Sequence, residues 1–159
     1  MTSIRITLSG VALALASLAA STANAATFSQ LVIFGDSLSD TGNLSLATLG
    51  TQPPAGQGYV NGRFSDGPLW VETLADGLGL SANAAPSLAG GNNYAFAGAR
   101  TGTDTSPPGV LGQVAGIWGT ANAAADPTAL YVVVGGGNDM RDARSAFTGT
   151  TAADDAGRM

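Results

Sequence analysis

The chain contains no cysteine, no histidine and no lysine. The absence of cysteine excludes disulfides, thiolate metal sites and a cysteine nucleophile. The absence of histidine removes the side chain that most often transfers protons near neutral pH and most often binds metals. The six basic residues are scattered arginines and the net charge is -5, so no surface is expected to neutralise a run of phosphates. Nucleic acid is therefore not an expected partner.

Charged residues are few, at 11%, whereas hydrophobic residues make up 45% and glycines number 23. This composition is typical of a soluble Ala- and Gly-rich chain, and not of a disordered or coiled-coil one. A length of 159 residues is enough for one domain with a hydrophobic core, and too short for two to be expected.

The first 25 residues have the pattern of a secretory signal peptide. Arg5 precedes an apolar stretch over residues 8–20, and Ala-Asn-Ala at 23–25 is a small-x-small cleavage site. A transmembrane anchor is the alternative, but polar and small residues interrupt the apolar stretch, which is shorter than the ~20 residues of a spanning helix. No later segment is apolar for long enough to span a membrane. We predict cleavage after Ala25 and a secreted or periplasmic mature domain over residues 26–159.

Two short apolar runs that end in glycine predict buried strands. Residues 30–35 indicate a strand buried on both faces, and residues 129–134, which end in Gly-Gly-Gly, indicate a second. Residues 92–97 read as another extended segment. Because helical patterns separate these runs, we expect parallel strands joined by crossovers in an α/β fold, with polar residues at the carboxyl ends of the strands forming the site.

Two segments between the strands predict helices. Residues 67–80 place Trp70, Leu74 and Leu78 at helical spacing. Residues 110–118 place Leu111, Val114 and Trp118 on one apolar stripe, despite their glycines. Residues 50–62 are rich in glycine and proline, which predicts an irregular surface loop near the site.

Three polar groups follow the predicted strands. Ser37 comes just after the first strand, where its hydroxyl can meet a substrate, although serine at such a position is more often a helix cap or turn residue. Asn138 follows the second strand and offers an uncharged amide donor, and Gly98 allows close approach of its backbone N–H. Together they predict an oxyanion hole with a serine nucleophile. Asp36 and Asp139 are expected to hold loops by hydrogen bonds to backbone N–H groups, and not to act in catalysis.

These residues resemble the GDSL esterases and lipases of the SGNH hydrolase superfamily. The resemblance covers most of the mature chain and rests on four segments in order: residues 34–43 (FGDSLSDTGN), 61–70 (NGRFSDGPLW), 93–99 (NYAFAGA) and 136–139 (GGND). One departure is Ala97, where the family usually has glycine.

The resemblance implies a three-layer α/β/α sandwich with a parallel, flavodoxin-like sheet that is incomplete at the C-terminus of this chain. It also implies Ser37 as nucleophile, with the Ser37 and Gly98 N–H groups and the Asn138 side chain as oxyanion donors. The implied reaction is hydrolysis of an ester, such as a lipid, aryl or acylated sugar ester, through an acyl-Ser37 intermediate. It needs neither metal nor cofactor.

The family's last motif, an aspartate followed by the catalytic histidine, has no counterpart here. Because a serine hydroxyl is a weak nucleophile without a base, we predict that this chain alone does not catalyse ester hydrolysis. Two explanations stay open. The chain is the N-terminal part of a longer hydrolase, which we favour, or it is a complete protein that has lost catalysis and only binds its ligand. The predicted helix that begins near Asp139 favours the first, because ending there would leave apolar surface exposed.

Two other classes of function compete with the hydrolase. One is a non-catalytic extracellular binding module for an acylated sugar or lipid. The other is a phosphate-binding protein built on the glycines at 135–137, which is weaker because no lysine follows and the phosphate-loop spacing is absent. The sequence leaves open the acyl-chain length, the alcohol, the oligomeric state and an outer-membrane association through a further C-terminal region.

Overall fold

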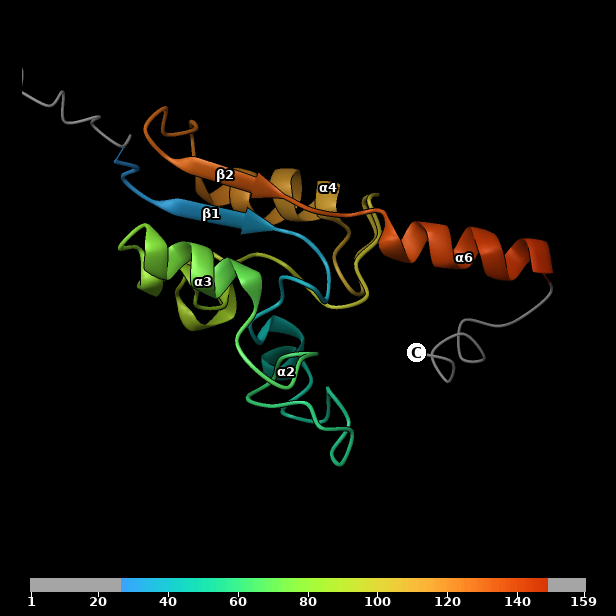
Figure 1. The fold of residues 1–159 in the computed structure, drawn as a ribbon. Helices are drawn as coiled ribbons and strands as arrows, with labels where there is room; N and C mark the ends of the chain where they lie inside the picture. The colour runs from blue at the N-terminus through green and yellow to red at the C-terminus, as the bar shows by residue number, and fades with distance from the viewer. Residues whose placement is uncertain (1–26, 149–159) are drawn as a thin grey trace, which may run out of the picture.

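The computed structural model describes residues 27–148, so the predicted signal peptide lies outside the described residues. The described chain is mixed α/β, with two strands and several short helices and 3-10 turns (Figure 1). Among the described residues, no helix has the length and apolar character needed to cross a membrane. In chain order the elements are β1 (Leu31–Phe34), α2 (Asn43–Ala47), α3 (Trp70–Gly77), η2 (Ser81–Ala84), η3 (Ser87–Ala89), α4 (Val110–Gly112), η4 (Gln113–Trp118), α5 (Gly119–Ala121), β2 (Leu130–Val133) and α6 (Gly137–Thr148).

The two strands form a parallel sheet, as the sequence predicts. Their register runs from Leu31 opposite Leu130 to Phe34 opposite Val133. Parallel strands need a long crossover connection, and the helices between β1 and β2 supply it (Figure 1).

A third segment pairs with the other edge of β1. The Ile33 N–H donates to the Asn92 carbonyl at 3.0 Å, and the Tyr94 N–H donates to the Ile33 carbonyl at 2.7 Å. Ile33 and Asn93 thereby form a parallel bridge. The extended segment predicted over residues 92–97 is therefore present, as an edge partner that makes β1 the central strand.

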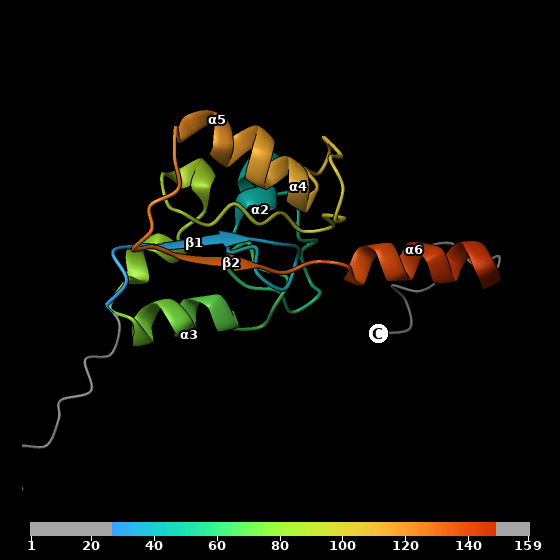
Figure 2. The ribbon, with the colours of Figure 1, turned by 90° about the horizontal axis from the view of Figure 1, so that it is seen from above.

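Helices cover both faces of the sheet (Figure 2). Successive side chains of a strand point to opposite faces. Leu31 and Ile33 belong to the cluster that includes α3, and Val32 and Phe34 pack with the helix formed by α4, η4 and α5. All four residues of β1 are buried, which confirms the predicted burial on both faces.

Both predicted helices form, and part of each predicted apolar stripe packs on the core: Leu74 on α3, and Val114 and Trp118 on η4. Trp70 is 45% exposed, whereas Val71 and Ala75 are buried; Leu111 is 52% exposed, whereas Val110 is buried. The first residue of each predicted stripe therefore does not face the core. Neighbouring apolar positions are only about 100° apart on a helix, so a short apolar stripe does not decide which of the two meets the sheet.

The prediction that the second strand is buried is also wrong. The residues of β2 are partly exposed, and Val133 is 62% exposed. In the described part of the chain β2 pairs only with β1, so its other edge is open. An apolar, β-branched sequence predicts a strand but does not show that both of its edges are covered.

The loop between α2 and α3 contains no regular element over residues 50–62, as predicted. It leads into Arg63, whose guanidinium donates to both carboxylate oxygens of Glu72, at 2.7 and 2.5 Å. Glu72 in turn accepts the Leu69 N–H at 2.8 Å, which caps the start of α3. This ion pair therefore gives the segment over residues 61–70 a structural role.

Candidate active site

The turn after β1 is held by Asp36 and leaves Ser37 accessible. The Asp36 carboxylate accepts the Leu38 N–H at 3.0 Å, and its carbonyl accepts two further N–H groups, from Ser39 and Asp40, at 3.0 Å each. Asp36 is 4% exposed, and Ser37 is partly exposed. The predicted loop-holding role of Asp36 is confirmed. Within residues 27–148, neither the N–H nor the hydroxyl of Ser37 makes a hydrogen bond.

Asp40 joins the Ser37 turn to the segment that carries Gly98. Its carboxylate, fully buried, accepts the N–H groups of Gly42 at 2.8 Å, Asn43 at 2.6 Å and Leu44 at 3.1 Å, which cap α2. It also accepts the Ala97 N–H at 2.8 Å. Burial raises the pKa of Asp40, and the four N–H donors oppose that rise. Asp40 therefore caps α2 and also makes a long-range contact that the sequence does not indicate.

Two buried asparagines extend this contact. The Asn93 amide donates to the Ser39 carbonyl at 2.7 Å and to the Thr41 hydroxyl at 3.0 Å. The Asn43 amide donates to the carbonyls of Asn93 and Ala95, at 2.7 and 2.9 Å. Both asparagines are fully buried. The sequence does not predict their role; the only indication is that both are polar residues near a predicted strand.

Gly98 has the backbone conformation that its predicted role requires. Its φ is +82°, in the left-handed region where a side chain is disfavoured. Its N–H donates to no group in the described chain. Ala97, the departure from the family pattern, is 3% exposed and fits without displacing the turn, since its N–H still reaches Asp40.

Asn138 lies at the start of α6, after the glycines that follow β2. It is 8% exposed, and its amide donates to the Ala99 carbonyl at 2.7 Å. An amide NH₂ has two N–H groups, so this bond leaves one for another acceptor. The bond also fixes the side chain next to Gly98.

Asp139 and Asp142 attach the first turns of α6 to residues 100 and 101. Asp139 accepts the Thr101 hydroxyl at 2.7 Å and the Thr101 N–H at 3.1 Å, and these bonds lower the pKa of Asp139. Arg100 pairs with Asp142 at 2.5 Å. The predicted loop-holding role of Asp139 is confirmed. The remainder of α6 extends away from the other elements, as Figures 1 and 2 show.

The three predicted site residues therefore lie on segments that the fold connects. Asp40 ties the Ser37 turn to the residue before Gly98, and Asn138 is bonded to the residue after Gly98. A side chain at position 137 would start 3.8 Å from the Asp36 carboxylate, so the start of α6 also lies beside the Ser37 turn. Between residues 27 and 148 no three acidic side chains gather as metal ligands would.

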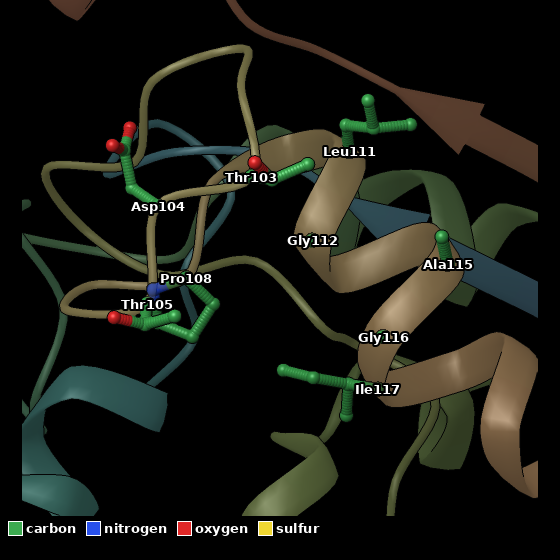
Figure 3. Close-up of a pocket in the computed structure, with 9 residues that line it drawn as sticks. All are labelled: Thr103, Asp104, Thr105, Pro108, Leu111, Gly112, Ala115, Gly116 and Ile117. Atoms are coloured by element: carbon green, nitrogen blue, oxygen red, sulfur yellow. The ribbon is translucent and has the colours of Figure 1, made fainter.

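A mostly apolar hollow of about 590 Å³ lies between the loop over residues 103–108 and the outer side of the α4–η4 helix (Figure 3). Leu111 and Ile117 are among the residues that line it. None of Ser37, Gly98 or Asn138 lines this hollow.

Comparison with known proteins gives matches along most of the chain. The GDSL-like lipase/acylhydrolase family matches residues 31–157. A phosphatidylcholine-sterol acyltransferase of Aeromonas hydrophila is 49% identical over 49 residues, which are 31% of this chain and 14% of that protein. A GDSL esterase/lipase of Arabidopsis thaliana is 36% identical over 108 residues, which are 58% of this chain and 30% of that protein.

A further relative, Lipase 1 of Photorhabdus luminescens, is 33% identical over 118 residues, which are 74% of this chain and 16% of that protein. The chain thus spans less than a third of the length of these relatives. The family match covers the strands, the Ser37 turn, Gly98 and Asn138. This chain belongs to the GDSL-like lipase/acylhydrolase family.

Proposed function

We propose that this chain is the N-terminal part of an exported serine ester hydrolase with the three-layer α/β/α fold of the SGNH superfamily. Ser37 attacks the ester carbonyl and becomes acylated as the ester C–O bond breaks and the alcohol leaves. Water then cleaves the acyl-Ser37 intermediate, which releases the carboxylic acid and regenerates Ser37. The observation that carries this proposal is a pair of unpaired donors on connected segments: the N–H groups of Ser37 and Gly98 have no partner in the described chain, and Asp40 joins the two segments.

The arrangement suits a tetrahedral intermediate. Its negative oxygen needs preorganised donors that do not have to reorient during the reaction. The two backbone N–H groups and the remaining N–H of Asn138 are such donors, because buried side chains fix their segments. Leu38, 63% exposed beside Ser37, offers apolar surface that favours an acyl substrate.

The proton acceptor is proposed to come from a part of the parent protein beyond this chain. A serine hydroxyl needs a base close by to act as a nucleophile, and this chain has no histidine. We propose that the parent supplies an aspartate and a histidine after residue 159, and that this chain alone does not hydrolyse esters. Residues 1–25 are proposed to be an export signal that is cut after Ala25.

The test is ester hydrolysis by the complete gene product, measured with p-nitrophenyl esters. Ser37→Ala should lower kcat by about 10⁶-fold, as expected when a catalytic serine is removed. Ser39→Ala is the matched control, because the Ser39 hydroxyl is buried and has no hydrogen-bond partner. Retention of activity in Ser37→Ala would show that another residue is the nucleophile. Binding of esters by the complete product without turnover would favour the non-catalytic module.

A further inference from the structure

Gln113 is a fully buried amide that no step of the proposed reaction uses. Its side-chain carbonyl accepts the Gly35 N–H at 2.9 Å, and its NH₂ donates to the Gly35 carbonyl at 2.9 Å. The same NH₂ donates to the Pro108 carbonyl at 2.9 Å. One side chain therefore bonds to both backbone groups of Gly35, although Gly35 and Gln113 are 78 positions apart in the sequence.

The amide stands where the sheet hydrogen bonding is interrupted. On this edge of β1, the Ile33 N–H donates to Asn92, and the N–H groups of Tyr94 and Phe96 donate to Ile33 and Gly35. A regular parallel ladder would give the Gly35 N–H the Tyr94 carbonyl as its acceptor. Gln113 provides that acceptor instead, so its side chain replaces a peptide group of the neighbouring strand.

The replaced position lies just before the nucleophile. Gly35 is two residues ahead of Ser37, and its surroundings are tight: a Cβ at position 35 would lie 3.3 Å from Ser39 and from the Val134 carbonyl. Fixing both backbone groups of Gly35 fixes the direction in which the chain enters the Ser37 turn. The Ser37 N–H has no partner of its own to do so.

Gln113 is also connected, through Pro108 and Pro107, to Gly98, the other proposed backbone donor. Its third bond holds the carbonyl of Pro108, and the adjacent Pro107 lies 3.4 Å from where a Cβ of Gly98 would be. The amide thus connects the turn of Ser37 with the loop that packs on Gly98. Its backbone begins the π-helical turn η4, a feature that is frequent at functional sites.

We propose that Gln113 is a positioning residue that sets the geometry of the oxyanion donors at Ser37 and Gly98. This inference rests on the proposed function. It predicts that loss of the amide affects the chemical step beyond its effect on folding, because a misplacement of about 1 Å can cost about 100-fold in rate.

The test compares Gln113 with a second side-chain amide that also bonds to the backbone along β1. Asn83 accepts the Leu31 N–H at 2.7 Å, at the other end of β1, and so provides a matched control. In the complete gene product, Gln113→Met should lower kcat by about 10- to 100-fold with KM little changed. Gln113→Glu keeps an acceptor for Gly35 and should lower kcat less. Asn83→Ala should lower the thermal midpoint and leave kcat unchanged.

A second measurement does not depend on hydrolysis. The amide ¹⁵N–¹H resonance of Ser37 should move in both Gln113 variants and stay in place in Asn83→Ala. If the wild type does not hydrolyse esters, the proposed function fails, and this resonance still decides the role of Gln113. An unmoved Ser37 resonance overturns the inference. So does an equal loss of kcat in the Gln113 and Asn83 variants of an active wild type.

Discussion

The segments around Ser37 and around Asn138 are held in different ways. The Ser37 turn and the Gly98 segment share a network of fully buried polar side chains, Asp40, Asn43 and Asn93. The start of α6, in contrast, is attached mainly through contacts with residues 99–101, and much of α6 is exposed. Met140 is 72% and Phe147 93% exposed.

This difference predicts that the two segments contribute differently to folding and to catalysis. Buried polar groups are costly unless all of them are paired, so a paired network around Ser37 stabilises one arrangement of the first two donors. In the proposed reaction, Asn138 contributes a donor to a site that the rest of the fold has already ordered. We therefore expect changes at Asn138 to affect chemistry more than folding, and changes in the buried network to affect folding first.

Among the changes that test this comparison, Asn138→Ala should give the largest effect. Loss of one oxyanion donor costs about 10²- to 10³-fold in kcat, whereas loss of its single bond to Ala99 should lower the free energy of unfolding by only about 1 kcal/mol. The measurement is kcat of the complete gene product together with urea denaturation. Asn122→Ala is the control, because the Asn122 amide also donates to a carbonyl, that of Trp118, at 2.8 Å. An unchanged kcat would place the third donor elsewhere.

The family features of this site could be predicted from the sequence, but the means of holding them could not. Short motifs at strand ends indicated Ser37, Gly98 and Asn138, because a parallel sheet brings the carboxyl ends of its strands to one edge. The bond from Asn93 to Ser39 and the bond from Gly35 to Gln113 join residues more than 50 positions apart. No local pattern encodes such a pairing, since it depends on which face of each segment the packing selects.

The packing errors have the same origin. Spacing alone places Trp70 and Leu111 on the apolar stripes, yet the neighbouring Val71 and Val110 are the buried residues. The hydrophobic pattern found the helices, and contact with the sheet determined their rotation. For β2, its composition indicated a strand, while its exposure depends on neighbours that composition does not describe.

Asp40→Asn should give the next largest effect, this time on folding. An amide presents only one oxygen, so it cannot accept the N–H groups that bind both carboxylate oxygens of Asp40. We expect a loss of about 2–3 kcal/mol in the free energy of unfolding, as for unpaired buried donors, measured by urea denaturation.

The control for Asp40 is Asp126, a carboxylate that also accepts four hydrogen bonds but is only partly buried. Its donors are the hydroxyls of Ser29 and Thr128, the Thr128 N–H and the Gln30 amide. Because water can replace these donors, Asp126→Asn should change stability less than Asp40→Asn. Equal losses at the two sites would mean that burial is not what makes the network around Ser37 robust.

The smallest effect is expected from pH at the attachment of α6. Hydrogen bonds from the Thr101 hydroxyl and N–H lower the pKa of Asp139 below its ordinary value of 3.8. A carboxyl group with a lowered pKa in the folded state stabilises it above its ordinary pKa, and this contribution is lost as the pH falls through the lowered value. The amide resonance of Thr101 should therefore move on acidification below pH 3.8.

The shift should be absent in Asp139→Asn and retained in Asp76→Asn, which changes an exposed acid on α3. If the Thr101 resonance titrates equally in Asp139→Asn, another acid controls this loop. The contrast between the Ser37 turn, held by buried side chains, and the start of α6, attached through residues 99–101, then loses its main support.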